Sequence, residues 1–100
     1  MRIIAISDLH GNEKALKRVL SVGKKVDLIL LAGDLTILGR QMHELLNKFN
    51  SLKKPVLIIT GNHEDEKQMK HLCNLHKYLY FMNNKVLKLD NKLFYGYDTN

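Results

Sequence analysis

The sequence is poor in residues and patterns that mark several classes of protein. Its 100 residues include one cysteine, one proline and no tryptophan. A single cysteine cannot form an internal disulfide, which argues against a disulfide-stapled secreted domain and suits a reducing compartment. The longest apolar runs are about five residues, whereas a membrane-spanning helix needs roughly 20. We therefore expect a cytoplasmic protein that does not enter a membrane.

The chain carries an excess of positive charge, but that charge is scattered. Sixteen Lys and Arg against ten Asp and Glu give a net charge of +6, which favours an anionic partner such as a phosphorylated substrate or a nucleic acid. The lysines occur in pairs such as Lys24 with Lys25, without a basic run of about five or more. Nucleic-acid binding is therefore compatible with the sequence but not indicated by it.

One pattern occurs three times: a short apolar run, a polar loop and a segment with helical periodicity. The three runs are, in chain order, Ile3–Ile6, Leu28–Ala32 and Val56–Ile59. In the second helical segment, Met42, Leu45, Leu46 and Phe49 share one face at i, i+3, i+4, i+7 spacing. Runs this continuously apolar are typical of parallel strands covered on both faces, so the repetition predicts a βαβαβα unit.

The pattern changes after the third helical segment. Short strand-like runs follow at Tyr78–Met82, Val86–Leu89 and Leu93–Tyr97. The polar pairs between them, Asn83-Asn84 and Asp90-Asn91, are interpreted as hairpin connections. The predicted fold class is therefore α/β, with a βαβαβα parallel sheet followed by short strands in a single domain over residues 1–100.

All three polar loops carry side chains of metal-ligand type. Asp8 and His10 follow the first run, Asp34 follows the second, and Asn62 and His63 follow the third. The loops after parallel strands emerge at one edge of the sheet, so these side chains should gather there. Any one of them alone is more simply a helix cap or turn former, but their recurrence favours a site. Such mixed nitrogen and oxygen donors suit Mn²⁺, Fe or Zn²⁺.

These loops resemble a known family. In order and spacing, Asp8-Leu9-His10-Gly11-Asn12, Gly33-Asp34 and Gly61-Asn62-His63-Glu64 are similar to the first three motifs of the calcineurin-like metallophosphoesterases. The resemblance implies an αββα sandwich, of which residues 1–100 would supply about half to two-thirds. Ile37-Leu38-Gly39 stands where the protein Ser/Thr phosphatases have Asp-Arg-Gly, so the chain looks more like the small prokaryotic phosphoesterases.

The resemblance also implies a role for each motif residue. Asp8 and His10 would hold a first metal ion, Asp34 would bridge two ions, and Asn62 would hold the second. His63 would be the catalytic residue, acting on the substrate without binding metal. Two divalent ions, with Mn²⁺ as the first choice and Fe, Zn²⁺, Ni²⁺ or Co²⁺ as alternatives, would activate a water for attack on phosphorus.

The implied function is metal-dependent hydrolysis of phosphomonoesters or phosphodiesters, with Arg40 as a candidate to bind the substrate phosphate. The family takes further ligands from a later His loop and a Gly-His-x-His motif, and neither occurs in these residues. Asp8, His10, Asp34 and Asn62 alone would leave both ions under-coordinated. Three explanations of the missing ligands remain open. The sequence is one part of an active enzyme, or a form that a homo-oligomer or a partner chain completes, or a non-catalytic binding or scaffold module.

Overall fold

This computed structural model describes residues 1–7, 9, 12–33, 40–60 and 66–97, with the backbone alone at 40 and 41. Its elements are β1 (Ile3–Ile6), α1 (Glu13–Gly23), β2 (Leu28–Ala32), α2 (Arg40–Asn50), β3 (Val56–Ile59), α3 (Glu66–Asn74), β4 (Leu79–Phe81), β5 (Lys85–Leu89) and β6 (Lys92–Gly96). The first four strands form a parallel sheet in the order β1-β2-β3-β4, and β5 pairs with β6 in antiparallel orientation. The predicted α/β fold is confirmed, and the first three strands have the predicted bounds.

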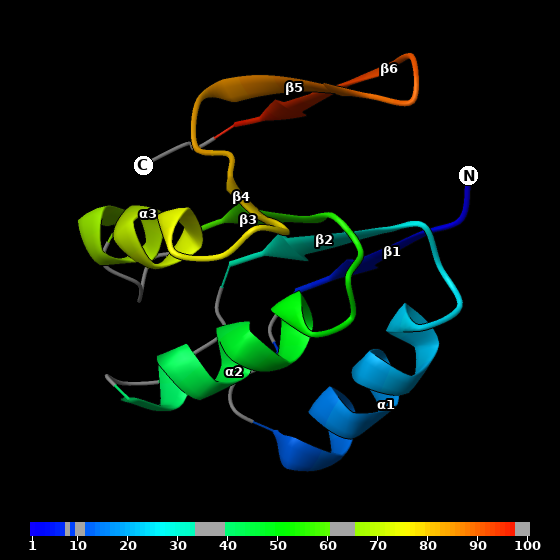
Figure 1. Cartoon of the computed structure of the whole chain (residues 1–100), viewed down its shortest axis with the longest axis vertical. Coiled ribbons are helices and arrows are strands. Elements are labelled where there is room, and N and C mark those ends of the chain that lie inside the picture. The colour runs from blue at the N-terminus through cyan, green and yellow to red at the C-terminus, as the bar shows by residue number, and fades with distance from the viewer. Residues whose placement is uncertain (8, 10–11, 34–39, 61–65, 98–100) are drawn as a thin grey trace.

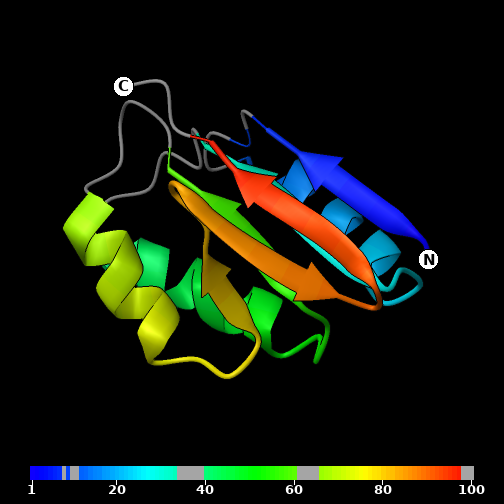
Figure 2. The ribbon, with the colours of Figure 1, turned by 90° about the horizontal axis from the view of Figure 1, so that it is seen from above.

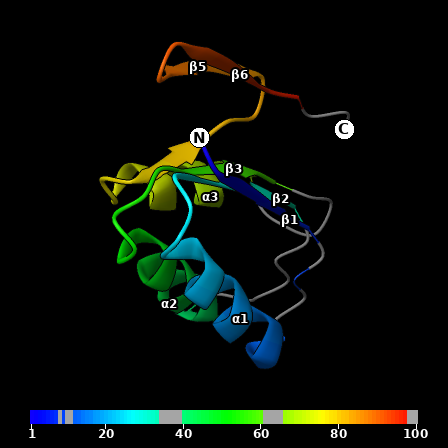
Figure 3. The same ribbon diagram turned by 90° about the vertical axis from the view of Figure 1, so that its right-hand side faces the viewer.

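The elements stack in three layers: helices, parallel sheet and hairpin (Figure 1; in profile in Figure 3). Each connection leads to the next strand across the sheet, always towards the same side. The helices α1, α2 and α3 therefore all cover one face of the sheet. The main core lies between them, where Leu31 and Ile58 of the sheet belong to one buried cluster with Leu46, Phe49 and Leu72 of the helices. No helix in the described ranges is long and apolar enough to cross a membrane.

A second, smaller core lies on the opposite face of the sheet. There Leu28, Leu57 and Met82 are buried, and Leu87 and Phe94 of the β5–β6 hairpin pack against them. Viewed from above, the two hairpin strands lie over the sheet nearly along the direction of its strands and leave β1 uncovered (Figure 2). The architecture is thus a helix-covered parallel sheet with a two-stranded hairpin on its other face, which agrees with the predicted partial sandwich.

The two predicted hairpin connections have different outcomes. Asp90 and Asn91 have φ of 51° and 62°, and they join β5 to β6 in the two-residue turn that both positive φ values favour. The hairpin predicted at Asn83-Asn84 is wrong, because β4 pairs in parallel with β3 and the chain leaves that sheet for the second layer. An Asn-Asn pair marks a turn, but it does not decide which strands pair across it.

Gly96 allows the hairpin to pack closely against the parallel sheet. A Cβ at this position would overlap the carbonyl group of Met82 and lie 2.7 Å from the Met82 Cβ. A backbone carbonyl cannot turn aside as a flexible side chain can. Gly96 therefore sets how near β6 approaches the segment that follows β4.

We expect Gly96→Ala to lower the free energy of unfolding by about 1–3 kcal/mol, because the added methyl must push β6 away from Met82. Urea unfolding followed by circular dichroism measures the change. Leu93→Ala on the same strand is the control: its side chain is 60% exposed, so it should change stability by about 0.5 kcal/mol or less. Equal stability of Gly96→Ala and wild type would contradict the close approach.

A carboxylate joins the beginnings of β1 and β2. The Asp27 Oδ2 accepts a hydrogen bond from the Arg2 backbone N–H at 2.7 Å, and the Asp27 N–H donates to the Arg2 carbonyl oxygen at 2.8 Å. The bond from Arg2, with smaller help from the N-terminal ammonium group, holds the pKa of Asp27 below its usual 3.8. Ionised Asp27 therefore favours the folded state.

This lowered pKa predicts a pH-dependent stabilisation. Its contribution is present above the unfolded-state pKa of 3.8 and is lost as the pH falls through the lower folded-state pKa. Asp27→Asn keeps an acceptor oxygen but cannot ionise, so it should be less stable than wild type at neutral pH and equal to it in strong acid. Urea unfolding over an acid-to-neutral pH series tests this, and a difference independent of pH would rule it out.

Candidate functional site

The carboxyl ends of β1, β2 and β3 lie together at one edge of the parallel sheet (Figure 2). In register, Ile6 pairs with Leu31, and Ala32 pairs with Ile59. The last residues of the three strands are therefore level with one another to within one position. This is the edge at which parallel α/β sheets place their functional loops.

The predicted site residues follow directly from this edge in the chain. Outside the described residues lie all the predicted metal ligands and the catalytic histidine: Asp8, His10, Asp34, Asn62 and His63. Arg40 begins α2, and its side chain also lies outside the described part. The structure does place Ser7, Gly33 and Thr60, which precede these segments at the ends of three adjacent strands. Elsewhere in the described ranges, no three His, Cys, Asp or Glu side chains form a group that could hold a metal ion.

Leu9 anchors the segment that links β1 to α1. Its side chain is 4% exposed and belongs to the core beneath the helices. Its carbonyl oxygen accepts a hydrogen bond from the Asn12 N–H at 3.0 Å. Leu9 stands between Asp8 and His10 in the sequence, so the backbone joining these two predicted ligands is tied to the core.

Asn12 caps the amino end of α1, as its position predicts. Its Oδ1 accepts a hydrogen bond from the Ala15 N–H at 3.0 Å, and Glu13 adds a negative charge in the first turn. The last side chain of the first motif is therefore used to begin the helix.

Loss of this cap should have a defined cost. We expect Asn12→Ala to destabilise the protein by about 0.5–2 kcal/mol, and Asn12→Ser to stay close to wild type because serine also accepts from the first-turn N–H groups. Thermal and urea unfolding compare the three proteins. If serine and alanine were equally destabilising, the hydrogen bond to Ala15 would not be the cause.

Gly33 turns the chain at the end of β2. Its φ is 71°, in the left-handed region that favours glycine, and its N–H donates to the Ile59 carbonyl oxygen at 2.8 Å. The sequence pattern suggests that this glycine allows close approach of the backbone. The structure adds that the turn itself requires it, immediately before Asp34.

Asn83 and Thr60 form a polar pair that the sequence pattern does not reveal. The Thr60 N–H donates to the Asn83 Oδ1 at 3.1 Å, and the Asn83 Nδ2 donates to the Thr60 Oγ1 at 2.6 Å. Among the residues described, these are the two buried polar side chains, at 5% and 8% exposure. In the sequence, Asn83 appears only as half of an Asn-Asn turn signal, which hides its contact with the end of β3.

Cys73 takes no part in this chemistry. Burial raises the pKa of its thiol to about 12, so the thiol stays protonated at neutral pH and cannot act as a thiolate ligand or nucleophile. This agrees with an oxygen and nitrogen donor set.

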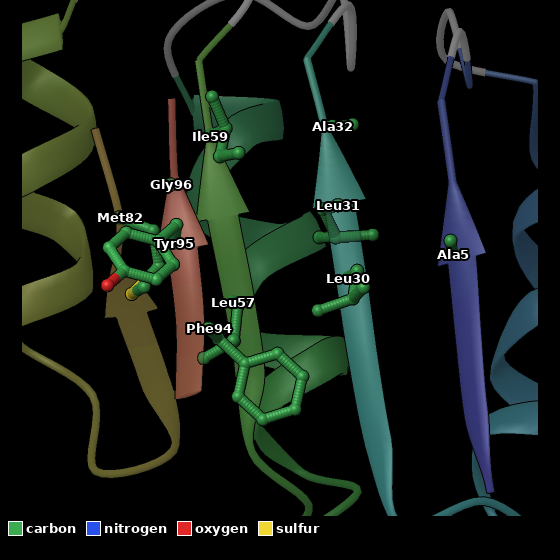
Figure 4. A pocket seen from close by; sticks show the side chains of 10 residues that line it. All are labelled: Ala5, Leu30, Leu31, Ala32, Leu57, Ile59, Met82, Phe94, Tyr95 and Gly96. Carbon is green, nitrogen blue, oxygen red and sulfur yellow. The ribbon is translucent and has the colours of Figure 1, made fainter. Parts of the chain in front are cut away.

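An apolar cavity of about 180 Å³ lies between the parallel sheet and the hairpin. Figure 4 shows its lining, which includes Leu30, Ile59, Met82 and Phe94. No charged side chain lines it. Tyr95 is the one lining residue that carries a hydroxyl group, and no carboxylate or imidazole lines the cavity, so the carboxyl edge is the better candidate site.

Comparison with known proteins gives a family and a fold. Residues 1–99 match the family described as calcineurin-like phosphoesterase. Over 67 residues the chain is 37% identical to the symmetrical bis(5′-nucleosyl)-tetraphosphatase of Buchnera aphidicola subsp. Schizaphis graminum, a match that covers 64% of this chain and 24% of that protein. A solved structure of a protein of unknown function from Aquifex aeolicus has a TM-score of 0.52 and 19% identity, covering 92% of this chain and 57% of that one. The chain thus spans about a quarter of the curated relative.

Proposed function

Since this chain belongs to the calcineurin-like phosphoesterase family, we propose that it carries out, as part of a complete site, the metal-dependent hydrolysis of phosphomonoesters or phosphodiesters. The observation that carries the proposal is the level ending of β1, β2 and β3 at one sheet edge, directly before the three motifs. The matched tetraphosphatase adds nucleotides with several phosphates to the candidate substrates. The net charge of +6 favours such anions.

The donor set fits two divalent cations, of which Mn²⁺ is our first choice and Fe, Zn²⁺, Ni²⁺ and Co²⁺ are alternatives. Asp8 and His10 would hold one ion, Asn62 the other, and Asp34 both. When bound, the ions supply Lewis-acid polarisation of the phosphoryl oxygens and a water that ionises near neutral pH. The carboxylate of Asp34 would offset the repulsion between the two cations, and the neutral amide of Asn62 would leave the site net positive towards a phosphate.

Two further side chains act on the substrate in this proposal. His63 would donate a proton to the leaving oxygen, or stabilise the charge that develops on it in the transition state. Arg40, at the start of α2, would bind the substrate phosphate through its guanidinium group.

Asp8, His10, Asp34 and Asn62 leave both ions short of ligands. We propose that further ligands come from chain beyond residues 1–100, from a second copy or from a partner chain, so that these residues form one part of the domain. The single cysteine fits a reducing compartment, and we place the reaction in the cytoplasm.

Mn²⁺ titration by calorimetry, together with hydrolysis of an aryl phosphodiester and an aryl phosphomonoester, tests this function. We expect Asp34→Asn to lose metal binding, since the bridging position loses its charge. His63→Ala should keep metal binding and lose about 10²- to 10⁴-fold in kcat, because only proton transfer is removed.

The matched control is His43→Ala, which removes an exposed histidine of α2 and should leave both measurements unchanged. Metal binding without hydrolysis of either ester would favour a non-catalytic binding or scaffold module. Equal activity of wild type and Asp34→Asn would contradict the proposed metal centre.

A further inference from the structure

We propose that Asn83 is a positioning residue for the third motif, holding the end of β3 from which Asn62 and His63 follow. The inference rests on the proposed function, because it assigns Asn83 to the support of that site. It starts from the buried Asn83–Thr60 pair, whose members are 23 positions apart in the chain.

The side chain of Asn83 replaces a backbone acceptor where the β3–β4 ladder ends. At the start of that ladder, the Val56 N–H donates to the Tyr78 carbonyl oxygen at 2.9 Å. The same spacing would pair the Thr60 N–H with the Met82 carbonyl oxygen, but that oxygen accepts from the Lys85 N–H at 3.1 Å. The Asn83 Oδ1 takes the Thr60 N–H instead.

The amide side chain of Asn83 satisfies both groups of Thr60 in this arrangement. The Oδ1 accepts from the backbone N–H, and the Nδ2 donates to the hydroxyl oxygen. Both side chains are buried, so water cannot easily replace either bond. An apolar residue at position 83 would leave the Thr60 N–H buried without its acceptor.

Two contacts hold the residue before Asn83. The preceding residue, Met82, donates its N–H to the Ile58 carbonyl oxygen at 2.8 Å. Gly96 of β6 packs against the Met82 carbonyl group, where no side chain would fit. The support for the end of β3 therefore runs from the hairpin layer through Met82 and Asn83 to Thr60.

This support bears on chemistry because Thr60 precedes Asn62 by only two residues. Two residues of extended chain span at most about 7 Å. A displacement of the Thr60 backbone would therefore also change the position available to Asn62, the proposed ligand. Hydrogen-bond partners that orient metal ligands typically change metal affinity or activity by about 10- to 100-fold when removed.

The experiment compares full-chain wild type with Asn83→Ala, Thr60→Val, Thr60→Ser and Asn47→Ala. Asn83→Ala removes both bonds, Thr60→Val removes the hydroxyl at nearly constant shape, and Thr60→Ser keeps the hydroxyl. Asn47→Ala repeats the alanine substitution at an exposed position of α2. The measurements are amide hydrogen exchange without metal, Mn²⁺ affinity, and kcat and KM for an aryl phosphodiester.

We expect Asn83→Ala to speed exchange selectively over residues 60–63 and to lower Mn²⁺ affinity and kcat by about 10- to 100-fold with little change in KM. Thr60→Val should change the same quantities in the same direction by less. Thr60→Ser and Asn47→Ala should match wild type. If Asn83→Ala fails to fold, the comparison of Thr60→Val with Thr60→Ser tests the positioning role. Faster exchange over residues 60–63 and weaker Mn²⁺ binding in Thr60→Val alone would support it.

Two results would overturn the positioning role. One is unchanged exchange over residues 60–63 in both Asn83→Ala and Thr60→Val. The other is a rise in exchange spread equally over β1 and β2, which would indicate general destabilisation. If wild type neither binds Mn²⁺ nor cleaves the ester even when the chain that completes the site is present, the proposed function fails. The exchange pattern alone then decides whether Asn83 positions this segment.

Discussion

The parallel backbone ladder that joins β1, β2 and β3 is the constraint on which the rest of the structure depends. It sets three strand ends level at one edge, so segments about 25 residues apart in the chain leave the sheet from neighbouring strand ends. The helices and their buried side chains stabilise this ladder from one face only. The place of the proposed site thus follows from strand register, and the chemistry proposed for it follows from the residues after each strand.

Several local features that satisfy backbone groups lie at the same edge. Gly33 turns with positive φ at the end of β2, Asn12 begins α1, and Thr60 is bound by Asn83 at the end of β3. Each satisfies backbone groups where a regular element stops, and each borders a predicted ligand segment. A metal centre needs such fixed points, because ligands orient an ion well only when their own backbone is held.

The hairpin layer has a part in this arrangement as well as in burial. It covers Leu57 and Met82, and through Gly96 it contacts the segment that carries Asn83. Support for the third motif therefore comes from residues that follow it in the chain. The chain belongs to the calcineurin-like phosphoesterase family, in keeping with the three motifs that follow its first three strands in the sequence. The ligands still needed for two ions explain why we propose that residues 1–100 are one part of the working domain.

The sequence by itself determined the strands Ile3–Ile6, Leu28–Ala32 and Val56–Ile59, because continuous apolar runs bounded by polar loops are local signals. It also determined the Asp90-Asn91 turn, whose residues tolerate positive φ. The roles of Asp8, His10, Asp34, Asn62 and His63 stay predictions. Only the tertiary structure decided that β4 joins the parallel sheet and that Asn83 binds the end of β3. Both depend on which distant segment lies alongside, and the pairing of strands is set by non-local packing that no short stretch of residues encodes.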